Sequence, residues 1–177
     1  MNKALSHLHT INKHKVKVTW LCFRCHLYKQ GLLHDLSKYS YIELKTGFHY
    51  YQGFRSPIDA EKEEKGYSLG WLHHKGRNKH HHEYWYDYAA PDKTPIIPYS
   101  YFVEMVCDML AAGMTYQGKK WSNEYELNYW MNKREECKIN PKLDFLLTKI
   151  FTDISSEGVK KVINKKNLKE LYRKYIG

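Results

Sequence analysis

The chain has 177 residues, of which 42% are hydrophobic and 27% are charged, a balance that is typical of a folded globular domain and excludes a disordered protein. Lysine and arginine exceed aspartate and glutamate by 29 − 19 = 10, which favours anionic partners such as a small phosphate-containing substrate or nucleic acid. No run approaches the roughly 18 apolar residues of a membrane span, and the polar N-terminus has no apolar signal core, so we expect a cytoplasmic protein without a membrane partner.

Helical periodicity recurs along the chain, and no segment has convincing strand alternation. Capping residues and glycines mark the breaks: Gly31 follows the first helix, Ser56-Pro57 begins another, and Gly113 ends a strongly amphipathic one. We therefore predict an all-α, single-domain helical bundle over residues 1–177. In chain order, helices are predicted at 14–30, from a start within 32–35, and at 41–51, 57–75, 81–88, 99–112, 122–137, 142–154 and 167–175.

The four cysteines do not form the framework of a disulfide-rich protein. The string Cys22-Phe23-Arg24-Cys25-His26 matches the C-x-x-C-H pattern of haem attachment, but both of its cysteines lie on the apolar stripe of the first predicted helix. We therefore interpret Cys22 and Cys25 as small core residues.

Histidines gather beside carboxylates at several points of the chain, which contains eleven histidines. His34 and Asp35 are adjacent at a predicted helix start, where both side chains can reach one ion. Further on lie His73-His74 and the run His80-His81-His82, followed by Glu83, which can orient a ligand histidine. Imidazole and carboxylate together favour Mn, Fe, Ni, Co or Zn over calcium, so the pattern predicts a transition-metal site.

Asp108 lies on the predicted 99–112 helix beside Cys107, whose side chain belongs to the apolar stripe. This position favours an inward carboxylate that binds the same ion as the histidines. Glu104 shares the face of Asp108 four residues earlier, so the two carboxylates can also form a solvent-exposed acidic ridge.

The segment Leu32-Leu33-His34-Asp35-Leu36-Ser37-Lys38 resembles the H-D-x-x-K signature of the HD-domain superfamily of metal-dependent phosphohydrolases. That family places a His, then His-Asp, then one or two His and a late Asp on a helical bundle. The resemblance spans residues 14–112, which would form an HD-like metal-binding core, with 113–177 as a helical C-terminal extension. The chain is also similar to a family of short bacterial and phage proteins of undefined function. This second resemblance rests on three short segments: Gly66-Tyr67-Ser68, residues 71–81 and Glu83-Tyr84-Trp85.

The HD resemblance implies one or two divalent transition-metal ions. His14 would be the first ligand, with His7, His9 and His26 as alternatives, and the run at 80–82 leaves open which of its imidazoles bind. The implied metal ligands are His14, His34, Asp35, His74, His81, His82 and Asp108. Catalytic roles fall to His34, Asp35, Lys38 and His74, and Lys38, Arg77 and Lys79 would contact the substrate phosphate.

The sequence thus predicts a metal-dependent phosphohydrolase that acts on a nucleotide or another small phosphate ester through a metal-activated water. One alternative is a basic, non-catalytic module that binds nucleic acid or acts as a phage-related inhibitor, because the net charge is +10. A further alternative is a di-iron oxygenase of the HD type.

Overall fold

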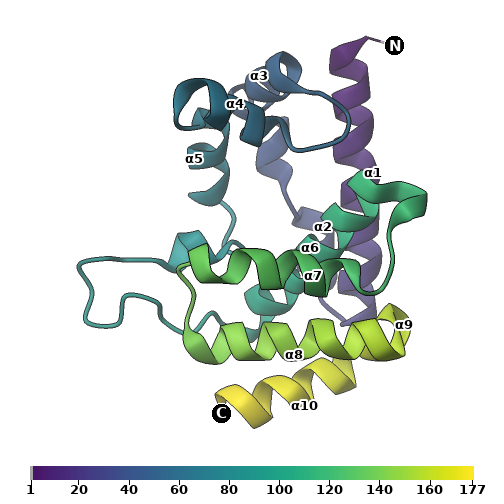
Figure 1. Cartoon of the computed structure of the whole chain (residues 1–177), viewed down its shortest axis with the longest axis vertical. Coiled ribbons are helices and arrows are strands. Elements are labelled where there is room, and N and C mark those ends of the chain that lie inside the picture. Colours follow the sequence, from purple (N-terminus) through teal and green to yellow (C-terminus); the bar gives the residue numbers. More distant parts are fainter. Residues whose placement is uncertain (1) are drawn as a thin grey trace.

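The computed structural model describes residues 2–177, and within this range it is an all-α helical bundle without a β-strand, as predicted (Figure 1). The helices of the described residues are α1 Lys3–Arg24, α2 Tyr28–Leu33, α3 Tyr41–Tyr50, α4 Pro57–Lys65, α5 Leu69–Lys75, α6 Tyr99–Gln117, α7 Tyr125–Lys133, α8 Pro141–Glu157, α9 Val159–Val162 and α10 Lys165–Ile176. Short 3-10 helices are η1 Leu36–Tyr39, η2 His82–Trp85, η3 Gly118–Lys120 and η4 Arg134–Glu136.

The first helix differs from the prediction at both ends. It begins at Lys3 because the side chain of Asn2 accepts a hydrogen bond from the Ala4 amide and caps it. It ends at Arg24, so Gly31 does not terminate it but lies within α2. A Cβ atom at Gly31 would lie 3.1 Å from the Cβ of Cys22, and the glycine therefore lets α2 pack closely on α1.

Two other glycines act differently from the prediction. The expected single helix over 57–75 is divided into α4 and α5, because Gly66 adopts a left-handed backbone (φ 77°) that closes α4. Gly113 does not end its helix, and α6 continues to Gln117. A Cβ atom at Gly113 would lie 1.8 Å from Oε1 of Glu126, so this glycine makes room for a side chain of α7.

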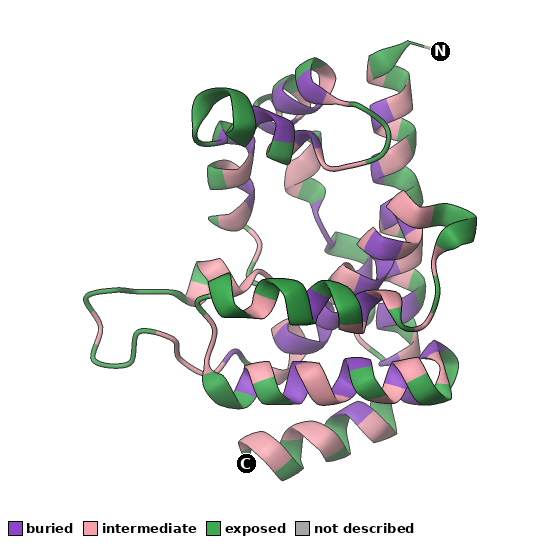
Figure 2. Ribbon diagram, in the orientation of Figure 1, coloured by how far each residue is buried: buried purple, intermediate pink, exposed green. Residues whose placement is uncertain are grey.

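The apolar core lies between α1, α6 and α8, with α9 and α10 closing it on one side (Figure 2). Val18, Leu110 and Ile150 show how each helix contributes, since each side chain is at most 1% exposed. Burying one such side chain contributes about 1.5–3 kcal/mol. Cys22 and Cys25 also belong to this core, as predicted.

The helices α3, α4 and α5 form a separate layer that contacts the N-terminal half of α1, at the opposite end of the molecule from α8 and α10 (Figure 1). The segment 86–98 projects as a loop, although Ile97 at its end is buried. None of the helices in the described part of the chain combines the length and apolarity that a membrane crossing requires. Buried polar side chains gather where α1, α5, α6 and the turn after α2 face one another.

Candidate metal centre

His34 and Asp35 lie in the turn that follows α2, rather than in the first turn of an α-helix. Asp35 adopts a left-handed backbone (φ 53°, ψ 29°), a conformation that Asp and Asn tolerate better than most residues. The turn directs both side chains inward, and they are 1% and 3% exposed. This sharp reversal is how two neighbouring residues of the chain reach the same polar cluster.

The first donor group combines His14 of α1 with His34, Asp35 and Asp108 of α6, and one ligand atom of each lies within 4.8 Å of the others. His14 Nε2 lies 2.9 Å from Asp108 Oδ1, and His34 Nε2 lies 3.2 Å from the same oxygen. His34 Nε2 is also 3.2 Å from Asp35 Oδ2. Four donors from three separate segments therefore converge on one point.

The second donor group combines Asp35 with His74 at the end of α5 and with His80 and His81 before η2. His74 Nε2 lies 3.3 Å and His80 Nε2 3.4 Å from Asp35 Oδ1. Asp35 thus turns one oxygen to each group. A carboxylate in this position can bridge two ions.

The donor distances fit a transition-metal ion. Ligands about 2.1 Å from one ion lie about 3.0–3.4 Å apart in octahedral or tetrahedral geometry, close to the separations above. Three buried atoms at the second group, Asp35 Oδ1, His80 Nε2 and His81 Nε2, have no hydrogen-bond partner within residues 2–177. An unsatisfied buried polar atom costs about 1–3 kcal/mol, and a bound cation removes this cost. These groups can therefore hold metal ions.

Two buried carboxylates orient the imidazole rings by contacting their Nδ1 atoms, on the side away from the donor groups. Glu104 Oε1 lies 3.0 Å from His34 Nδ1 and 3.2 Å from His80 Nδ1. Glu43 Oε2 lies 2.7 Å from His74 Nδ1. Because each ring gives Nδ1 to a carboxylate, its Nε2 is the atom that faces the donor group.

Burial and neighbouring charges shift the pKa values of several side chains in the cluster. Burial opposes ionisation of Asp35, but His34 and Lys38 outweigh it and hold the pKa of this carboxyl well below its usual range. Burial also opposes ionisation of Asp108, but hydrogen bonds from His14 and His34 outweigh it and hold the pKa of this carboxyl well below its usual range. Burial lowers the pKa of His81 well below its usual range. The carboxylates are thus ionised and His81 is neutral, the states in which these side chains bind metals.

Most of the ligands expected from the sequence lie in these groups, with one exchange in the histidine run. The predicted ligands that the structure brings together are His14, His34, Asp35, His74, His81 and Asp108. His82 lies outside both groups, because it begins η2 and its Nε2 lies 3.4 Å from Glu83 Oε1. His80, which the sequence left as an alternative, takes a place in the second group.

The predicted phosphate-binding residues are placed differently from one another. Lys38 Nζ lies 2.6 Å from Asp35 Oδ2, at the edge of the first group. Arg77 and Lys79 are exposed on the turn between α5 and His80. The Lys79 ammonium lies over the ring of Tyr84, 5.8 Å from its centre. Substrate binding by these three residues stays a prediction.

Glu104 and Glu43 are the residues whose function the sequence did not reveal. The exposed acidic ridge considered for Glu104 and Asp108 is wrong for Glu104, which is 6% exposed. Its spacing of four residues from Asp108 was the available signal. Glu43 stands three residues after the N-cap Ser40, a pattern typical of a capping box, but its side chain turns to His74 instead.

A family model described as a family of unknown function (DUF5662) matches residues 3–153. The chain belongs to this family. Comparisons with curated proteins and with solved structures found no match. The DUF5662 region includes every donor of the candidate centre, whereas α9 and α10 lie beyond it. Because the family description assigns no activity, the function has to be argued from the centre itself.

Proposed function

We propose that this member of the DUF5662 family is a metal-dependent phosphohydrolase that acts on a nucleotide or another small phosphate ester. The supporting observation is the placement of Asp35 between two donor groups, with Oδ2 towards His34 and Oδ1 towards His74 and His80. Two ions about 3.5–4 Å apart are the usual arrangement for displacement at phosphorus. The order of the donors along the chain is similar to that of the HD-domain superfamily, which supports the same reaction.

A divalent Mn, Fe, Ni, Co or Zn ion supplies a water of lowered pKa and a Lewis acid for a phosphoryl oxygen. The chain contributes the donor side chains and the charged groups around them. His14 of α1 and Asp108 of α6 would hold an ion at the first donor group, and neutral His81 would help to hold one at the second. The Lys38 ammonium lies beside Asp35, where its positive charge would attract the negative charge of a phosphate.

The test is the metal content and the activity of an Asp35→Asn variant. Asparagine tolerates the left-handed backbone at this position but removes the negative charge between the two donor groups, so we expect the fold to persist while bound metal and phosphate release fall at least ~100-fold. Elemental analysis measures the metal, and nucleotides and nitrophenyl phosphates measure hydrolysis. Asp92→Asn, on an exposed loop, is the matched control and is expected to match the wild type.

Two results would contradict the proposal. One is a wild-type protein that holds no stoichiometric transition metal after purification or reconstitution. The other is an iron-loaded protein that consumes dioxygen and releases no phosphate, which would favour the oxygenase alternative.

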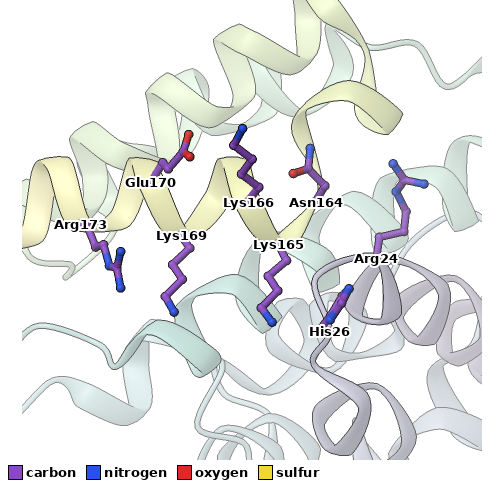
Figure 3. Close-up of a pocket in the computed structure, with 8 residues that line it drawn as sticks. All are labelled: Arg24, His26, Asn164, Lys165, Lys166, Lys169, Glu170 and Arg173. Carbon is purple, nitrogen blue, oxygen red and sulfur yellow. The ribbon is translucent and has the colours of Figure 1, made fainter.

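A second candidate function, nucleic-acid binding, is favoured by a basic groove at the C-terminal end of α1 (Figure 3). The groove has a volume of about 510 Å³, and its basic residues are Arg24, His26, Lys165, Lys166, Lys169 and Arg173. Arg24 donates a hydrogen bond to the Ile163 carbonyl and so joins α1 to the start of α10. Arg24 also stands ten residues after His14, about 15 Å along the helix, so the groove is separate from the metal centre.

The spacing of the cations in this groove favours a repeating anion. Lys165, Lys169 and Arg173 follow one another every four residues, so they form a row about 12 Å long on one face of α10 (Figure 3). A single phosphate group is too short to contact all three. The phosphodiester backbone of a nucleic acid offers one negative charge after another along such a row.

We expect the double variant Lys165→Glu, Lys169→Glu to bind a labelled single-stranded oligonucleotide at least ~10-fold more weakly than the wild type, with a salt dependence reduced by about two ion equivalents. Fluorescence anisotropy at several salt concentrations, with and without chelator, measures both. Lys119→Glu, Lys120→Glu on η3 is the control with the same change of charge. An equal loss in both double variants would show that net charge, and not the groove, drives binding.

A further inference from the structure

Glu104 is a single carboxylate that serves both donor groups. His34 and His80 present their Nε2 atoms to different groups, yet both turn Nδ1 to the same atom, Glu104 Oε1, at 3.0 Å and 3.2 Å. Their rings lie close together, with centroids 4.4 Å apart and planes inclined by 36°. The geometry of one ring therefore limits the geometry of the other.

Glu43 provides the contrast. Its Oε2 lies 2.7 Å from His74 Nδ1, and its Oε1 lies 2.7 Å from the Nδ1 of His73, which belongs to neither donor group. Glu43 therefore orients a ring of the second group only. Besides Asp35, which belongs to both donor groups, Glu104 contacts a ring of each group, whereas Glu43 contacts a ring of the second group only.

The consequence follows from how a carboxylate acts on a ligand histidine. Accepting the Nδ1 hydrogen fixes the tautomer, aims the Nε2 lone pair and makes it a better ligand, and removing such a partner usually weakens metal binding 10–100-fold. Glu104 does this for two rings at once. It also stands one helical turn before Asp108 on α6, so the same helix positions a donor and the carboxylate behind two other donors.

We propose that Glu104 is a positioning residue that couples the two ion positions, so that ordering His34 for one ion also orders His80 for the other. This inference rests on the proposed function only in requiring two ion positions. Loss of Glu104 then weakens both binding steps, whereas loss of Glu43 weakens one.

The experiment is a titration of the metal-stripped full chain with Co²⁺, followed by calorimetry and by the visible absorption of the bound ion. We expect two binding steps in the wild type. In Glu104→Gln both dissociation constants rise by about 10–100-fold, and in Glu43→Gln only the dissociation constant of the second donor group rises by this factor. Circular dichroism and thermal melting of each variant report whether it is folded.

A second pair of variants tests the coupling without changing Glu104. His14→Ala and His34→Ala each remove one donor of the first group, but only His34 contacts Glu104. We expect His34→Ala to weaken binding at the second group by more than His14→Ala does. Equal effects of these two variants would overturn the coupling even if Glu104→Gln does not fold.

The outcomes separate this inference from the proposed function. Two Co²⁺ ions bound by the wild type, with Glu104→Gln affecting one step or none, overturns the role of Glu104 and leaves the metal centre intact. Coupled binding of two ions without any phosphate release supports Glu104 and contradicts the hydrolase. A wild-type chain that binds fewer than two ions overturns the coupling.

Discussion

Asp35 carries two requirements that can be separated. Its backbone is left-handed (φ 53°), which Asn or Gly satisfies as well as Asp. Its two oxygens face different donor groups, and only a carboxylate shares a negative charge between both atoms. A substitution at this position therefore distinguishes the shape of the turn from the chemistry that the turn presents.

Lys38 offers a test of the phosphate-binding role. The variant Lys38→Met keeps the length of the side chain and removes its charge, so we expect kcat/KM for a phosphate ester to fall about 10–100-fold, mainly through KM, since a hydrogen bond to a charged group contributes about 1.5–3 kcal/mol. Steady-state kinetics with elemental analysis of the same sample measures this. The exposed Lys45→Met on α3 is the control. Loss of bound metal in Lys38→Met would show instead that the ammonium supports Asp35.

The donors of the site were predictable to different degrees, for physical reasons. His34 was recognisable from its neighbour Asp35 and from the H-D-x-x-K pattern, and Asp108 from its place beside Cys107 on the apolar stripe. The run at 80–82 has no periodicity, so the sequence cannot fix which of its rings turn inward; the turn before η2 selects His80 and His81. Glu43 was unpredictable because its role depends on α5, whose position no local pattern encodes.

The packing of α7 on α6 places a carboxyl in an apolar setting. Glu126 of α7 is 2% exposed, fits against Gly113 of α6, and accepts a hydrogen bond from Trp121 Nε1 at 3.1 Å. Burial and the charge of Asp108 outweigh the hydrogen bond from Trp121 and raise the pKa of Glu126 to about 7. The contact between the two helices therefore favours the protonated acid.

This shift predicts a pH dependence of stability. Because the pKa of Glu126 is higher in the folded than in the unfolded chain, ionisation destabilises the fold as pH rises from about 4.5 to about 7, by up to ~3 kcal/mol at higher pH. Glu126→Gln removes this penalty, so we expect it to be more stable than the wild type at pH 8 and nearly equal at pH 5. Denaturant unfolding at both pH values measures the difference. The exposed Glu135→Gln is the control, and an identical pH profile in all three proteins would contradict the prediction.

At the scale of the whole molecule, apolar periodicity predicted the all-α class and most helices, including α6, α8 and α10. It did not predict the role of each glycine. Gly66 ends a helix, whereas Gly31 and Gly113 lie inside helices where a neighbouring element comes close. A glycine has the same local preference in all three places, and only the partner helix decides between them.

The mutual neutralisation of the centre has an evolutionary consequence. Removing one partner of a buried charge pair costs about 3–5 kcal/mol, against a total stability of about 5–15 kcal/mol for a typical domain. A lineage that loses Asp35 alone keeps His34, Lys38 and His74 without the carboxylate that they face. Such intermediates are less stable than either the complete centre or a wholly apolar one. We therefore expect descendants of this chain to retain the set intact or to have replaced all of its members, with few sequences in between.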